Sequence, residues 1–155
     1  MSNLGCYQDC TNCTLSGECC SHFDRINSPV LNKEELIKIR NFISNNDFYK
    51  KISDNLFQLK VEDGKCIFYK NGKCSIYEYR PTDCKLYPFD IIKNGLNYYL
   101  ILYLLDCIDS DKMIRENPEI DNLIQSVIPW IEQFTDERNY TKMKKLKYEV
   151  IKEIK

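Results

Sequence analysis

The sequence has too little of several features that whole classes of enzyme and binding protein require. Its five glycines form none of the motifs that cradle a phosphate, which argues against nucleotide binding. Its single histidine, His22, means that an ordinary Ser-His-Asp triad could form only if that residue served. Its formal net charge of −1 provides no overall field to attract nucleic acid or an anionic membrane.

Long apolar runs are also missing, and we expect no leader peptide. The longest apolar stretch, residues 98–105, is far shorter than the roughly 20 apolar residues of a membrane-spanning helix. The first residues have neither the basic start nor the apolar core of a secretory signal. We therefore expect a cytoplasmic protein without a membrane partner, and its 155 residues predict a single domain.

Cysteine is the residue type that the chain has in excess, with nine copies. In a reducing compartment structural disulfides are uncommon, and clustered cysteines usually hold metal. An odd number also fits poorly with a fully paired disulfide scaffold. Two alternatives stay open: disulfides in an oxidising host, and separate buried thiols that act as small hydrophobic groups.

The spacing of the cysteines favours bound metal. Cys10 and Cys13 are separated by two residues, which lets one tight loop aim both sulfurs inward. Cys19 and Cys20 are adjacent, so their side chains diverge and would serve two sites or two edges of one cluster. Residues 66–84 then bring three more cysteines around turn signals.

One helix is predicted between the early and the late cysteines. Asn32 can cap it and Glu35 completes a capping box, because a glutamate three residues after the cap can bond back to the cap's N–H. Apolar residues recur on one face, and the helix should end near residues 45–46. A strand is expected over residues 56–61.

Two Asn-Gly turns predict two β-hairpins. Their expected strands are residues 66–69, 73–77, 89–92 and 96–104. A two-residue loop at the first turn would place Cys66 and Cys74 on opposite faces of the ribbon, whereas a three-residue loop over residues 70–72 would place them on one face. Because a shared metal requires one face, we predict the three-residue, bulged form.

Helical periodicity takes over near the end of the chain. Apolar residues recur on one face between residues 120 and 134, where Pro129 should kink or split the helix. Residues 136–155 keep an apolar stripe at helical spacing. Acidic residues are interleaved with the basic residues of this segment, which favours a solvated helix over a surface that binds nucleic acid.

The predicted fold class is therefore α+β. Two β-hairpins would be held together by a cysteine-ligated metal centre, with one helix before them and a helical segment after. Residues 1–117 are the expected metal-binding core, and residues 118–155 a helical appendage of the same domain.

Several short strings resemble the YkgJ-like cysteine-cluster family. They are Cys10-x2-Cys13, Cys19-Cys20, Cys66-Ile67-Phe68-Tyr69, Gly72-Lys73-Cys74-Ser75-Ile76-Tyr77-Glu78, Arg80-Pro81-x2-Cys84 and Tyr87-Pro88-Phe89. The resemblance covers residues 10–107. Members of that family are described as zinc- or iron-chelating domains, and flagellin lysine-N-methylases carry a related segment. The chain departs from the family pattern in having five residues between Cys13 and Cys19 instead of two, and in having Lys85 where relatives tend to have arginine.

The resemblance implies eight metal ligands: Cys10, Cys13, Cys19, Cys20, Cys66, Cys74, Cys84 and Cys107. Cys6 and His22 are candidate extra ligands, and Cys6 is the candidate spare thiol because it lies outside the family pattern. Arg80 and Lys85 are expected to support the ligands, because their charge can offset that of the thiolates and their N–H groups can hydrogen-bond to sulfur.

The choice of metal lies between iron and zinc. Zinc often takes its four ligands from two C-x2-C pairs, and this chain has one such pair. Iron–sulfur clusters tolerate scattered ligands, because the cluster itself is several ångströms across. We therefore expect one or more iron–sulfur clusters, with zinc as the alternative, in a structural or electron-transfer role.

Two other functions stay open from the sequence. One is an enzyme or enzyme subunit related to protein-lysine N-methylation, although no catalytic residues can be identified. The other is a zinc or iron carrier. Metal ions are the expected partners, together with a redox or enzyme protein.

Overall fold

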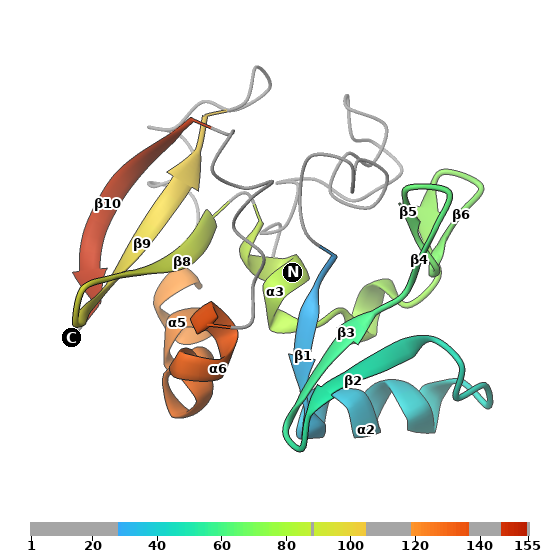
Figure 1. Cartoon of the computed structure of the whole chain (residues 1–155). Helices are drawn as coiled ribbons and strands as arrows, with labels where there is room; N and C mark the ends of the chain where they lie inside the picture. The colour runs from blue at the N-terminus through green and yellow to red at the C-terminus, as the bar shows by residue number, and fades with distance from the viewer. Residues whose placement is uncertain (1–27, 88, 105–118, 137–146, 155) are drawn as a thin grey trace.

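Helices and strands build two sheet-based units, joined by a segment of short hairpins (Figure 1). The computed structural model describes residues 28–87, 89–104, 119–136 and 147–154. The mixture of helix and antiparallel strand confirms the α+β class. The division into a core and an appendage stays a prediction.

The first unit is an antiparallel three-stranded sheet of order β1-β3-β2, with one helix packed against it. Its elements are β1 (Val30–Asn32), α2 (Lys33–Phe42), β2 (Tyr49–Ser53) and β3 (Leu56–Leu59). The strand β3 confirms the prediction for this stretch. The strands β1 and β2 were not predicted, because three residues are too few to show a pattern and the sequence of β2 is mostly polar.

The helix α2 begins as the sequence predicts. Asn32 Oδ1 accepts from the Glu35 N–H at 2.9 Å, and Glu35 Oε2 accepts from the Asn32 N–H at 3.2 Å, which is the full capping box. Leu36 and Ile39 are buried on its inner face. The helix ends at Phe42, a few residues before the expected end.

The predicted bulge at the first Asn-Gly turn is wrong. Tyr69 pairs with Cys74 and Lys70 with Lys73, which leaves a two-residue loop between β6 (Tyr69–Lys70) and β7 (Lys73–Cys74). Asn71 and Gly72 have φ values of 54° and 75°, so both adopt the left-handed conformation of a type I′ turn. Asparagine tolerates that conformation, and its twist matches that of the strands, so the hairpin needs no bulge.

Cys66 belongs to a different hairpin from Cys74, so the reason for predicting a bulge does not apply. It pairs with Val61 across β4 (Val61–Glu62) and β5 (Lys65–Cys66), around a turn in which Asp63 and Gly64 both have positive φ. The two cysteines therefore do not share one ribbon. Two consecutive small hairpins, rather than one long one, carry Cys66 and Cys74.

The second unit is an antiparallel sheet of order β10-β9-β8. The hairpin of β8 (Phe89–Asn94) and β9 (Asn97–Tyr103) confirms the prediction for this segment. Asn94 pairs with Asn97, so the loop is Gly95-Leu96, with φ of 64° at the glycine. Glycine at the first loop position is typical of a type II′ turn.

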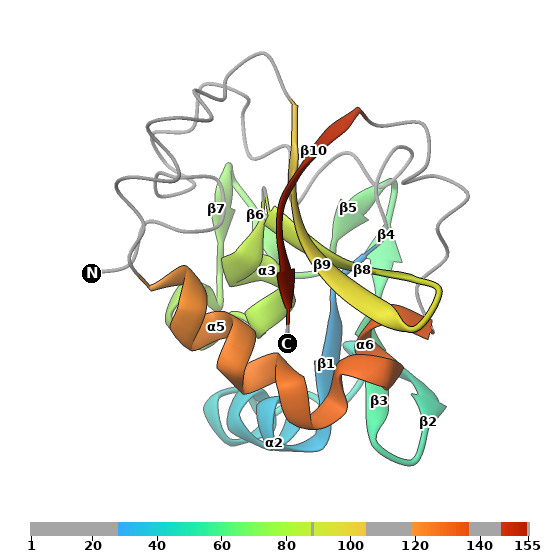
Figure 2. The same ribbon diagram turned by 90° about the vertical axis from the view of Figure 1, so that its left-hand side faces the viewer.

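Pro129 interrupts the C-terminal helical segment, as predicted. The segment consists of α5 (Ile120–Val127), the 3₁₀ helix η2 (Ile128–Trp130) and α6 (Ile131–Asp136). Figures 1 and 2 show these helices beneath the second sheet. Their buried side chains, Ile124, Val127, Trp130 and Phe134, form one core with those of β8 and β9.

The predicted helix at the end of the chain is wrong over residues 147–154. These residues include strand β10 (Tyr148–Ile154), which pairs with β9 at the edge of the sheet. The pairing register shifts between Val150 and Lys152, so Ile151 is an extra, bulged residue. The expected helical stripe included Val150 and Ile154, but Val150 is 53% exposed, and Ile151 packs on the core with Ile154 instead. The β-branched side chains here also suit a strand.

The remaining elements link the two units and carry the cysteines. After β7 the chain forms the 3₁₀ helix η1 (Tyr77–Tyr79) and the single-turn helix α3 (Thr82–Leu86). The helix α3 contacts β1 of the first unit and β8 and α5 of the second. It lies between the two units in Figure 1.

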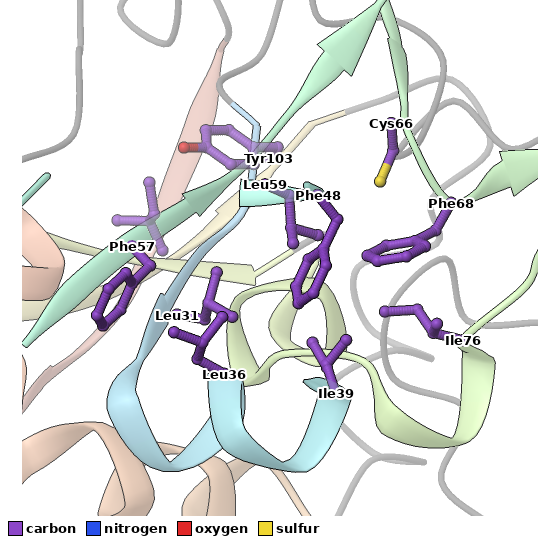
Figure 3. Packing of buried hydrophobic residues seen from close by; sticks show 11 residues of the cluster. Leu31, Leu36, Ile39, Phe48, Phe57, Leu59, Cys66, Phe68, Ile76 and Tyr103 are labelled. Atoms are coloured by element: carbon purple, nitrogen blue, oxygen red, sulfur yellow. The ribbon is translucent and has the colours of Figure 1, made fainter. Parts of the chain in front are cut away.

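A hydrophobic cluster extends from the first unit toward the small hairpins. Leu36 and Ile39 come from α2, and Cys66, Phe68 and Ile76 come from the segment of the small hairpins (Figure 3). The sulfur of Cys66 therefore lies at the border between an apolar core and the hairpins. None of the helices within the described ranges is long and apolar enough to cross a membrane.

Replacement of Gly72 by alanine should destabilise the protein by about 1 kcal/mol, because a side chain in the left-handed region costs roughly that much. A Cβ added there would meet no neighbouring atom within 4 Å, so the cost is conformational. Urea unfolding would measure it, with Ser75→Ala as the exposed control in the same segment. Equal stability of the two variants would contradict the left-handed turn.

Candidate metal centre

Three predicted metal ligands lie on β5, β7 and α3, in the part of the chain that links the two units. Cys66 is buried at the end of β5, while Cys74 at the end of β7 and Cys84 in α3 are partly buried. No disulfide joins two of these three cysteines. Turns and a single-turn helix, rather than long strands, therefore set the positions of the sulfurs.

The electrostatics of Cys84 show that the three thiols share one neighbourhood. Burial of its sulfur raises the pKa of Cys84 well above the ordinary value of a thiol. Negative charge on Cys66, Asp83 and Cys74 raises that pKa further. The nearby guanidinium of Arg80 acts in the opposite direction. Three thiolates at this place would repel one another, and a bound cation would relieve that repulsion.

Two carboxylates fix the helix that carries Cys84. Glu35 Oε1 accepts from the N–H and the hydroxyl of Thr82, at 2.8 and 2.5 Å. Asp83 Oδ2 accepts from the Val30 N–H at 2.9 Å. Thr82 and Asp83 are the two residues before Cys84. Their hydrogen bonds therefore attach the start of α3 to the first unit.

The carboxylate of Glu35 is costly to bury. Its pKa is raised by burial and, to a lesser degree, by the charge of Asp83. The hydrogen bonds from Thr82 and Asn32 act in the opposite direction, because they favour the charged form. The sequence identified Glu35 only as part of a capping box, and its bond to Thr82, 47 residues away, carries no local signal.

Arg80 lies beside the candidate site. Its Nε donates to the carbonyl oxygen of Tyr77 at 3.1 Å, and its guanidinium carbon lies 3.9 Å from the centre of the Tyr77 ring. These contacts hold its charge where it favours the thiolate of Cys84. The supporting role of Arg80 toward a metal stays a prediction, as does that of Lys85 in α3.

The other predicted residues lie outside the described ranges. They are the ligands Cys10, Cys13, Cys19, Cys20 and Cys107 and the candidate extra ligands Cys6 and His22. Their convergence on Cys66, Cys74 and Cys84 stays a prediction.

Within the part of the chain that the structure describes, no three His, Cys, Asp or Glu side chains form a group that could hold a metal ion. Thiolates are nevertheless the soft ligands that zinc and iron–sulfur clusters use. Zinc and each iron–sulfur cluster generally require four ligands, and the described thiols do not form a complete set by themselves. The residues present therefore fit part of such a centre, and a complete one needs further ligands from outside the described ranges.

A buried polar pair was also missed by the sequence analysis. The hydroxyl of Tyr103 donates to Asp90 Oδ2 at 2.6 Å, and Asp90 Oδ1 accepts from the Ile91 N–H at 2.8 Å. Both side chains are only 2% exposed. Asp90 stands between the apolar residues Phe89 and Ile91, which is the one signal in the sequence that could have drawn attention to it.

Comparison with known proteins relates the segment that carries these cysteines to a protein family. Residues 9–121 match a family model named CxxCxxCC and described as "Putative zinc- or iron-chelating domain". The chain belongs to this family. The match includes Cys66, Cys74 and Cys84 with the hairpins and helix that carry them, and it supports metal binding by the CxxCxxCC domain.

One relative is an uncharacterized protein of Methanocaldococcus jannaschii. It is 30% identical over 93 residues, which are 54% of this chain and 48% of the relative. The chain thus spans about half the length of that protein. No solved structure matches the chain.

In the metal-free protein, we expect Cys84 to react slowly with an alkylating agent at neutral pH. A raised pKa means that the thiol keeps its proton, and only the thiolate reacts. Alkylation of Cys84, followed by mass spectrometry, should show a midpoint at higher pH in the folded chain than in the chain unfolded in urea. The same midpoint in both states would contradict the described environment.

Proposed function

We propose that this chain is a metal–thiolate protein that carries one or more iron–sulfur clusters, in a structural or electron-transfer role. The observation that carries the proposal is the shared neighbourhood of Cys66, Cys74 and Cys84, in which neighbouring thiolates raise the pKa of Cys84. Membership of a family described as zinc- or iron-chelating supports it from an independent side.

Two features support a cluster over a single zinc ion. The sequence has one C-x2-C pair, whereas zinc sites often use two. The later cysteines have wider spacings, with seven residues between Cys66 and Cys74 and nine between Cys74 and Cys84. A cluster several ångströms across can reach sulfurs that lie further apart. Zinc remains the alternative metal.

The residues around the thiols have distinct tasks in this proposal. Cys66, Cys74 and Cys84 would bind the metal as thiolates, and their protons would be released on binding. Arg80 would offset part of the negative charge near Cys84. Thiolate ligands have to stay reduced, which favours a location in the cytoplasm.

Other functions receive less support. A zinc or iron carrier would need a labile site, and the burial of Cys66 and of the Cys84 sulfur favours a closed one. An enzymatic role, including one related to protein-lysine N-methylation, is supported by the resemblance to the family alone.

Purification without oxygen, followed by metal and sulfide analysis, tests the proposal. We expect a brown protein that contains iron and acid-labile sulfide. A colourless protein with stoichiometric zinc would replace the cluster by the alternative metal, and a protein without metal would refute both. Reversible bleaching by a reductant would support electron transfer over a purely structural role.

The Cys84→Ser variant should lose much of its metal, because serine provides no thiolate. The matched control is Ser75→Ala, which removes an exposed hydroxyl next to Cys74 and should keep the metal content of the wild type. Elemental analysis of both variants, purified side by side without oxygen, measures the difference. Full metal content in Cys84→Ser would remove this residue from the ligand set.

A further inference from the structure

One carboxylate connects the beginnings of two helices. Glu35 Oε2 accepts from the Asn32 N–H at the start of α2, while Glu35 Oε1 accepts from the N–H and hydroxyl of Thr82 at the start of α3. A negative group is favourable at both places, because helix N-termini carry unsatisfied N–H groups and partial positive charge.

The helix α3 depends on this contribution from outside. Its N-cap residue is Pro81, and no side chain within the helix caps it. Five residues are too few for a helix to be stable by itself, so tertiary contacts have to hold it. Glu35 supplies the missing cap from 47 residues away.

The capped residue is two positions before Cys84. In a single turn of helix, the direction of each Cα–Cβ bond follows from the placement of the backbone. The bond from the Val30 N–H to Asp83 Oδ2 holds the intermediate residue. Since Glu35 belongs to α2 and Val30 to β1, the frame that aims the Cys84 sulfur is built on the first unit.

We propose that Glu35 is a positioning residue for Cys84: by holding Thr82, it sets the orientation in which this thiol binds metal. The inference rests on the proposed function, since it assumes that Cys84 is a ligand. Residues that orient metal ligands through hydrogen bonds typically change metal affinity 10- to 100-fold when they are replaced, although they do not touch the metal.

A purely structural role of Glu35 as a helix cap is the competing explanation, and the chain offers a control for it. Asn32→Ala removes the other half of the capping box, the acceptor for the Glu35 N–H, and leaves the bond from Glu35 to Thr82 in place. It should lower stability without moving Cys84. Glu34→Gln, an exposed change in the same turn, controls for charge.

The experiment uses the full chain, purified without oxygen. The first readout is the rate at which the bound metal is lost to excess EDTA, and the second is the rate of Cys84 alkylation in the metal-free chain. Urea unfolding reports the stability of each variant. Glu35→Ala should release metal about 10- to 100-fold faster than the wild type and expose Cys84 to faster alkylation.

Asn32→Ala and Glu34→Gln should keep both rates at the wild-type value, even where Asn32→Ala lowers the unfolding midpoint. Glu35→Gln retains one oxygen that can accept from Thr82, so it should be intermediate, and it decides the question if Glu35→Ala does not fold. Wild-type rates in Glu35→Gln and Glu35→Ala, or equal acceleration in Asn32→Ala, would overturn the proposal.

Failure of the proposed function would look different. In that case the wild-type chain itself would be isolated without metal. The alkylation of Cys84 would then still show whether Glu35 orients this thiol.

Discussion

The electrostatic cost of ionising neighbouring thiols is the constraint on which this part of the molecule depends. Cys66, Cys74 and Cys84 share a neighbourhood in which burial and negative charge keep the proton on Cys84. Such an arrangement disfavours ionised sulfur unless a cation is bound. The guanidinium of Arg80 offsets only a part of the charge. A bound metal would offset the repulsion among the thiolates, whereas the two sheet-based units are joined by shared hydrophobic clusters.

Tight turns and a helix cap supplied by another element hold the segments that carry the thiols. Two type I′ turns fix the small hairpins, and a carboxylate from α2 fixes the single-turn helix that carries Cys84. None of these pieces has a core of its own, although the side chains of Cys66 and Phe68 extend the core of the first unit. Between two packed units, the segment from β4 to α3 is therefore held by hydrogen bonds and by its attachment to those units.

The sequence predicted features whose causes are local. The cap of α2, the interruption at Pro129 and the hairpin of β8 and β9 each follow from residues within a few positions. Features that depend on distant partners were missed or wrong. Strand β10 forms because β9 offers it an edge, and Glu35 bonds to Thr82 although 47 positions separate the two residues in the sequence. The number and spacing of the cysteines predict that they group around metal, but no local signal shows that Cys66 and Cys74 lie on separate hairpins.

X-ray absorption at the metal edge of the anaerobically isolated protein reports which atoms bind the metal. We expect a first shell dominated by sulfur at about 2.3 Å, as found for thiolate ligands. The number of sulfur neighbours should fall when Cys66, Cys74 and Cys84 are replaced together by serine. A shell of oxygen and nitrogen in the wild type, or a sulfur shell unchanged by that triple replacement, would contradict this expectation.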